Sequence, residues 1–121
     1  MRRGAEAIFC SIPARIGILG NPSDGYNGQC ISSLARNWRS SCVLTPHENR
    51  WDFTIDIRCG EESSTYKSMA SLAENPPDLS HDGLSRLVLG TLIHFQQECV
   101  ASGLAIEASG FQLKLETDIP R

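Results

Sequence analysis

The sequence predicts an α+β fold, in which a mostly antiparallel or mixed sheet carries its helices on one face. Residues 51–58 alternate strictly between apolar and polar side chains, which is typical of a strand with one buried face. Residues 82–101 carry apolar side chains at helical spacing, which predicts an amphipathic helix. Residues 111–116 return to alternation and predict a last strand. Strands, then helices, then a closing strand indicate an α+β layer structure.

The first part of the chain holds short apolar runs between turn-forming residues. Residues 8–12 and 15–19 predict two strands, and Pro13-Ala14 is predicted to break them apart. Residues 20–28 predict an irregular connection, because this stretch contains three glycines and a proline. We therefore expect the chain to leave its second strand into a long loop.

The middle of the chain is predicted to add strands and then a short helix. Residues 31–34 and 41–45 predict two further strands on a mixed pattern of apolar and polar residues. Residues 63–73 predict the helix, and the prolines at positions 76–77 end it. The apolar residues expected on one side of this helix are Tyr66, Met69, Ala70 and Ala73.

The segment 82–101 predicts the longest helix. Asp82 can cap its first turn, and Gly103 can close its last turn. The apolar stripe expected to face the sheet comprises Leu84, Leu87, Val88, Leu92, Phe95 and Cys99. With a length of 121 residues, we expect these elements to form a single domain, 1–121.

Composition and charge exclude several classes of protein. Hydrophobic residues make up 40% of the chain and charged residues 21%, which is ordinary for a globular domain with a core. The formal net charge is −3 and no basic patch occurs, so we expect no nucleic-acid partner. No run approaches the ~20 apolar residues needed to span a bilayer, and the N-terminal apolar stretch is too short for a signal peptide. We expect a cytoplasmic protein with no membrane partner.

The cysteines give no sign of a disulfide or metal framework. Their number is odd, and no pair has C-x-x-C spacing. We expect reduced thiols that are mostly buried as small apolar side chains, with a secreted disulfide scaffold as the alternative. The five are Cys10, Cys30, Cys42, Cys59 and Cys99.

The stretch RIGILGNPSDGYNGQ, residues 15–29, concentrates polar groups after an apolar run. Its glycines, at positions 17, 20, 25 and 28, do not form the G-x-G-x-x-G of a dinucleotide site. Tyr26 stands where a phosphate-binding Walker loop would have its lysine. The remaining alternatives are a long connection between strands and a pocket for a polyhydroxylated small molecule, whose hydroxyls need both hydrogen-bond donors and acceptors.

The segment PARIGILGNPSDGYNGQCIS resembles the first motif of the GHMP small-molecule kinases, a family that includes galactokinase and mevalonate kinase. The variant LGNPSDGYNG is most similar to the glucuronokinase-like branch, which phosphorylates sugar acids or related sugars. The closing strand followed by TDIPR resembles the approach to the second motif of the family, a phosphate loop of the type P-x-x-x-G-L-x-S-S. The resemblance implies the N-terminal part of the GHMP kinase fold, the fold of the second domain of ribosomal protein S5.

This resemblance also implies an activity and roles for particular residues. The parent reaction is the transfer of the ATP γ-phosphate to a sugar hydroxyl, with the anomeric hydroxyl of glucuronate as one candidate. Arg15 would lie near the reacting centre, where it would lower the pKa of a catalytic aspartate or of the attacking hydroxyl. Asp24 would accept hydrogen bonds from sugar hydroxyls. The other residues implied to line or shape the substrate pocket are Asn21, Ser23, Tyr26 and Gly28.

The sequence departs from the family pattern at its end. It stops at Arg121, where the phosphate loop is expected to begin, so we expect an incomplete kinase domain. ATP and Mg²⁺ are implied for the complete parent enzyme, whereas we expect the chain alone to bind no cofactor and to be inactive. We also expect it to self-associate through uncovered apolar surface. The alternative is a non-catalytic α+β interaction module or a decayed kinase remnant.

Overall fold

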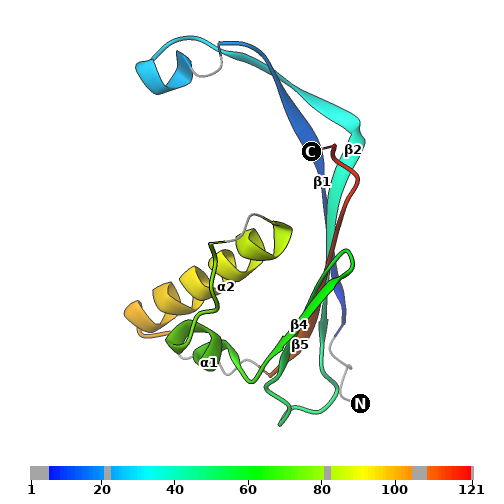
Figure 1. Ribbon diagram of the computed structural model, residues 1–121, viewed down its shortest axis with the longest axis vertical. Coiled ribbons are helices and arrows are strands. Elements are labelled where there is room, and N and C mark those ends of the chain that lie inside the picture. The colour runs from blue at the N-terminus through cyan, green and yellow to red at the C-terminus, as the bar shows by residue number, and fades with distance from the viewer. Residues whose placement is uncertain (1–5, 21–22, 81–82, 105–108, 121) are drawn as a thin grey trace.

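One mixed sheet of five strands, with helices packed on one face, forms the part of the chain that the computed structural model describes: residues 6–20, 23–80, 83–104 and 109–120 (Figure 1). The strand order across the sheet is β1-β2-β5-β3-β4. Every neighbouring pair is antiparallel except β3 and β5, which run parallel. The predicted α+β class, with a mostly antiparallel sheet and helices on one face, is therefore confirmed.

The strands differ greatly in length. The bounds are β1 Ile8–Leu19, β2 Ile31–Pro46, β3 Ile55–Cys59, β4 Glu62–Tyr66 and β5 Phe111–Thr117. The long strands β1 and β2 form a hairpin that extends well beyond the rest of the sheet, and its tip curves over the side on which the helices lie (Figure 1).

The core lies between the sheet and the two α-helices, α1 (Met69–Glu74) and α2 (Leu84–Ala101). Ile55 and Ile57 of β3 and Leu72 of α1 are almost fully buried. Successive residues of a strand point to opposite faces, so the alternation seen in the sequence places the apolar residues of β3 and β5 on the helix side. The remaining buried members of the core cluster are Cys59, Val88, Leu89, Ile93 and Leu113.

Strand β1 is continuous, although Pro13-Ala14 was expected to break it. The register moves from Pro13 opposite Arg39 to Ala14 opposite Ala35, so residues 36–38 of β2 fall outside the pairing. Such an irregularity bends the hairpin and tolerates a proline, because β1 lies at the edge of the described sheet and the proline sits at the bulge. The two strands predicted at 31–34 and 41–45 are likewise one strand, β2.

The prediction of a helix over 63–73 is wrong in its first half. Residues 62–66 form β4, which pairs with β3 through a tight turn at Gly60, whose φ of +62° favours glycine. The helix begins only at Met69, where the Ser68 hydroxyl accepts a hydrogen bond from the Ser71 backbone N–H at 3.0 Å. Strand β3 also begins later than the alternation indicated, at Ile55 rather than at residue 51.

Helix α2 is confirmed, and its C-terminus ends as predicted. Gly103 has a φ of +69°, its N–H donates to the Val100 carbonyl at 3.1 Å, and the Leu104 N–H donates to the Cys99 carbonyl at 2.9 Å. This pair of bonds is the Schellman motif. At the other end Gly83 is the N-cap residue, and the predicted cap Asp82 lies outside the described residues.

The face that α2 buries is rotated from the predicted stripe. Leu87 and Phe95 were expected to face the sheet, but 64% and 54% of their surfaces are exposed. The buried residues are Val88, Leu89, Ile93 and Cys99. The helix is apolar on more than one side, so periodicity alone did not identify the side that meets the sheet.

The cysteines are less buried than predicted. All five are free, but Cys10 and Cys30 are exposed, Cys42 is half-buried, and only Cys59 and Cys99 are buried. The physical reason is their position, because Cys10 lies in the edge strand β1 and Cys30 immediately precedes β2.

Candidate functional site

The candidate site is the hairpin tip, where the connection between β1 and β2 contains the short 3₁₀-helix η1 (Ser23–Tyr26). Leu19 pairs with Ile31, so the loop closes on itself within the hairpin. A Cβ atom at Gly20 would lie 2.8 Å from the Cα of Cys30, and the φ of Gly20 is +83°. Only glycine fits this close approach of the two loop ends. The backbone packing at Gly20 therefore constrains the conformation of the loop.

The hairpin carries the residues that the sequence proposed as a site. Arg15 lies on β1 opposite Leu34 and is exposed. Ser23 and Asp24 form the first half of η1, and their side chains lie outside the description. Tyr26 ends η1 with 86% of its surface exposed. Gly28 follows in the same loop, and Asn21 falls outside the described residues.

The part of the hairpin next to its tip presents apolar surface beside these polar groups. Between 45% and 63% of the surface of each of its large aliphatic side chains is exposed. Surface of this kind is typical of a face that contacts a further structural layer or a partner. These side chains are Ile16, Ile18, Leu19, Ile31 and Leu34.

Hydrogen bonds, here called the polar tie, join the middle of the hairpin to the segment that follows β5. The Arg39 guanidinium donates to the Ser11 hydroxyl at 2.8 Å and to the Ser11 carbonyl at 3.2 Å. The Arg39 backbone N–H donates to the Asp118 carboxylate, and the Asp118 N–H donates back to the Arg39 carbonyl at 3.1 Å. The segments around Ser11 and Asp118, which the sequence singled out separately, are therefore held side by side.

No pattern in the sequence indicated this tie. Arg39 and Asp118 are 79 residues apart, and neither belongs to a local motif that would indicate its partner. Only the placement of β2 between β1 and β5 brings the three residues together.

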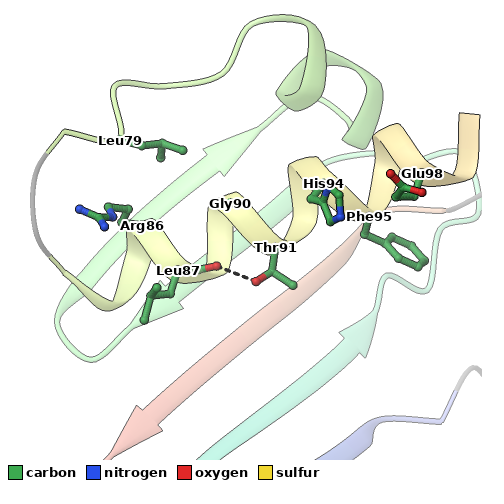
Figure 2. Close-up of a pocket in the computed structure, with 8 residues that line it drawn as sticks. All are labelled: Leu79, Arg86, Leu87, Gly90, Thr91, His94, Phe95 and Glu98. Carbon is green, nitrogen blue, oxygen red and sulfur yellow. Dashed lines mark hydrogen bonds between the residues drawn. The ribbon is translucent and has the colours of Figure 1, made fainter. Parts of the chain in front are cut away.

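A hollow lies elsewhere, along the outer face of α2 (Figure 2). It has a volume of about 660 Å³, it is mainly apolar, and none of the predicted site residues lines it. Figure 2 shows the Thr91 hydroxyl turned back to the Leu87 carbonyl, to which it donates at 2.8 Å. The residues around this hollow are Leu79, Arg86, Leu87, Gly90, Thr91, His94, Phe95 and Glu98.

A smaller hollow of about 240 Å³ lies between β3, β4 and the start of α2. On its wall the Ser85 hydroxyl donates to the Glu62 carboxylate. Burial, followed by the negative charge of Glu62 and the neighbouring Cys42, raises the pKa of the Cys59 thiol. The raised pKa favours the protonated thiol, which is the weaker nucleophile.

The polar cluster at the other end of the hairpin is structural. His47 Nε2 lies 3.6 Å from the Asp56 carboxylate and 3.4 Å from the Thr54 hydroxyl. Thr54 donates to Asp52 through its hydroxyl at 2.6 Å and its N–H at 3.0 Å, and these hydrogen bonds lower the pKa of Asp52. Across the described residues, no three histidine, cysteine, aspartate or glutamate side chains gather as they would around a metal ion.

The length and apolar character of the described helices were compared with those of membrane-spanning helices. None of the described helices combines the length and the apolar character that a helix needs to cross a bilayer.

The fold is similar to part of a galactokinase. The chain superposes on the crystal structure of Lactococcus lactis galactokinase complexed with galactose, with a TM-score of 0.61 and 15% sequence identity. The superposition covers 97% of this chain and 28% of that chain. The predicted GHMP kinase fold is therefore confirmed at the level of structure.

The sequence leads to the same family. The chain is 31% identical over 108 residues to glucuronokinase 1 of Arabidopsis thaliana, and 30% identical over 108 residues to probable glucuronokinase 2 of the same plant. Each match covers 89% of this chain but only 29% of the relative, so the chain spans less than a third of the length of these curated relatives. No family model matches the chain. The predicted resemblance is confirmed: the chain is related to the GHMP sugar kinases and corresponds to their N-terminal part.

Proposed function

We propose that this chain supplies the N-terminal part of an ATP-dependent sugar kinase, which transfers the γ-phosphate of ATP to a sugar hydroxyl. The observation that carries the proposal is the sequence match to two glucuronokinases over 89% of the chain. It makes a sugar acid the first candidate substrate, with the anomeric hydroxyl of glucuronate as the acceptor. The galactokinase fold supports the class of enzyme but not the choice of sugar.

In this proposal the hairpin tip binds the sugar. Asp24 accepts hydrogen bonds from sugar hydroxyls, and a carboxylate acceptor is stronger than a neutral one. The loop around Asp24 shapes the pocket, and its proposed members are Asn21, Ser23, Tyr26 and Gly28. This assignment explains why polar residues are concentrated in a loop whose ends are fixed by the close approach at Gly20.

Arg15 is the residue that we assign to the reacting centre. Phosphoryl transfer depends mainly on positioning and on electrostatic stabilisation of the oxygens of the transferring group. A permanently charged guanidinium on a strand suits this task, because it offsets negative charge and favours the deprotonated form of a nearby aspartate or hydroxyl. Arg15 is exposed on β1, in the part of the hairpin that leads to the tip.

The described residues do not fit ATP or Mg²⁺ by themselves. The sequence contains no glycine-rich phosphate loop, and the described residues hold no cluster of metal-ligating side chains. We propose that both are used by the complete enzyme through other segments, and that this chain alone transfers no phosphate. A cytoplasmic location accords with the five free cysteines, because thiols stay reduced there.

The test is a chimaera in which this chain replaces the matched segment of Arabidopsis thaliana glucuronokinase 1. The purified chimaera is incubated with ATP and with glucuronate, galactose or a non-sugar alcohol, and sugar phosphate is detected by ³¹P NMR. We expect glucuronate to be phosphorylated in preference to galactose. The isolated chain, run in parallel, is expected to give no product.

Arg15→Leu in the chimaera separates catalysis from folding. Removing one electrostatic donor of this kind lowers kcat by about 10²–10³-fold in other enzymes, and we expect a loss in this range. Arg58→Leu is the matched control, because Arg58 is also exposed on a strand but lies in β3, away from the hairpin. A chimaera that folds and is inactive with every sugar would support the alternative, a non-catalytic module or decayed remnant.

A further inference from the structure

Two cysteines face each other across the edge of the sheet. Cys10 of β1 is the register partner of Cys42 of β2 in an antiparallel pair. Side chains of directly opposed residues point to the same face of the sheet. Cys42 packs against the core cluster, so both thiols lie on the side of the sheet that carries the helices.

The pair satisfies the distance requirement of a disulfide. Directly opposed residues of antiparallel strands have Cα atoms about 4.5–5.5 Å apart, and disulfides join Cα atoms about 4.4–6.8 Å apart. The strand register therefore places the two Cα atoms within the range that a disulfide spans.

The other cysteines are excluded by the same geometry. Cys59 lies in the same row as Cys42, but β5 separates them, because both residues pair with Leu115. Two strand spacings amount to about 9.5 Å, which exceeds the reach of a disulfide. Cys30 lies beyond the opposite end of β2, and Cys99 lies in α2.

We propose that Cys10 and Cys42 form a disulfide when the protein meets a low-molecular-weight disulfide such as oxidised glutathione. The exposed Cys10 thiolate attacks one sulfur of the oxidant, which forms a mixed disulfide and releases one thiolate. The Cys42 thiolate then attacks the Cys10 sulfur, which forms the protein disulfide and releases the second thiolate. Two protein thiols are oxidised and one small disulfide is reduced to two thiols.

The environments of the two cysteines explain why Cys10 reacts with the oxidant before Cys42 does. Cys10 is exposed and can meet the oxidant first, whereas Cys42 is half-buried. Burial, and then the proximity of Cys10, raises the pKa of the Cys42 thiol. Cys42 therefore reacts slowly with oxidant in solution and acts on the sulfur placed next to it.

The bond would enclose residues 10–42, which include the entire hairpin tip. Closing a loop of this size stabilises the folded state by restricting the unfolded chain. The effect requires only the strand pairing, so the proposal stands independently of the proposed sugar kinase function.

The experiment treats the reduced chain with oxidised glutathione, blocks the remaining thiols with an alkylating reagent and maps the peptides by mass spectrometry. We expect one intramolecular Cys10–Cys42 disulfide and three alkylated cysteines. In Cys42→Ser we expect glutathione to remain attached to Cys10, because the second thiol is missing. Cys59→Ser is the matched control, in which the disulfide still forms.

Thermal unfolding gives an independent readout. The oxidised chain should melt roughly 10 °C above the reduced chain, and Cys10→Ser should show no such rise. The proposal is overturned if Cys10 and Cys42 remain separately modified, if Cys10 is joined to Cys30 or to a second molecule, or if oxidation leaves the melting temperature unchanged.

Discussion

Replacing Gly110 by alanine should strongly destabilise the fold. Gly110 is buried where β5 begins, and its N–H donates to the Asp52 carbonyl at 2.6 Å while its carbonyl accepts from the His47 N–H at 3.0 Å. An added Cβ would lie 2.6 Å from the Thr54 nitrogen and 2.7 Å from the Phe53 carbonyl carbon. Both are backbone atoms, so no side-chain rotation can relieve the overlap.

The size of the effect follows from these contacts. Overpacking costs about 1–3 kcal/mol, and the backbone shift weakens two hydrogen bonds worth about 0.5–1.5 kcal/mol each. We expect Gly110→Ala to lower the free energy of unfolding by about 2–6 kcal/mol. This is a large part of the about 5–15 kcal/mol that stabilises a typical domain.

Gly90→Ala is the matched control with the opposite sign. Gly90 lies inside α2, and an added Cβ would meet no atom within 4 Å. Alanine is favoured over glycine within a helix by about 0.5–1 kcal/mol, so this variant should be more stable than the parent chain.

Urea unfolding followed by circular dichroism measures both variants. The reasoning would be refuted if Gly110→Ala unfolded within about 0.5 kcal/mol of the parent chain, or if Gly90→Ala were destabilised to a similar extent. A change in the m-value would instead indicate an altered unfolded state or a loss of two-state behaviour.

Three further predictions concern the core, the acid response and the surface. Ile55 is fully buried, so Ile55→Ala should lower the free energy of unfolding by about 2–5 kcal/mol in urea titrations. A loss below about 1 kcal/mol would contradict the placement of Ile55 in the core. Hydrogen bonds from Thr54 hold the pKa of Asp52 below its unfolded value, so its stabilising contribution is complete at neutral pH and declines as pH falls through the folded pKa. In Asp52→Asn, the free energy of unfolding should therefore fall less steeply as the pH is lowered. An unchanged dependence on pH would argue against a stabilising role for the Asp52 carboxylate. Phe9 and Ile12 are 68% and 62% exposed, so we expect the chain to self-associate. Its apparent mass in sedimentation should rise with concentration, and this rise should be smaller in Ile12→Lys. A monomer at every concentration would refute self-association.

The sequence was sufficient for β5 and for the extent of α2. Strand β5 alternates cleanly, and Gly103 marks the end of α2, so both were predicted at nearly their observed bounds. The segment 62–66 was missed because Ser64 and Tyr66 are its only half-buried residues, and its pairing with β3 depends on the turn at Gly60. Strand pairing of this kind is a tertiary effect that overrides local preference.

The candidate sugar site stays a prediction, and it was proposed on a different basis. The loop after β1 has a local motif, so its position could be identified without knowledge of the fold. The tie between Ser11, Arg39 and Asp118 has no local signal, because it depends on the order of three strands. Leu87 and Phe95 of α2 were predicted to be buried, but they are exposed. An apolar side chain alone does not show which face of a helix packs against the sheet.

The measurement that bears most directly on the proposed sugar site is the kcat/KM of the chimaera for glucuronate with Asp24→Ala and with Glu48→Ala. A hydrogen bond to a charged group contributes about 1.5–3 kcal/mol, so Asp24→Ala should lower kcat/KM by about 10- to 150-fold. Glu48 is an exposed carboxylate in the loop after β2, and its removal should leave kcat/KM unchanged, with circular dichroism checking that both variants fold. Equal kcat/KM values for the two variants would contradict the assignment of the hairpin tip as the sugar-binding site.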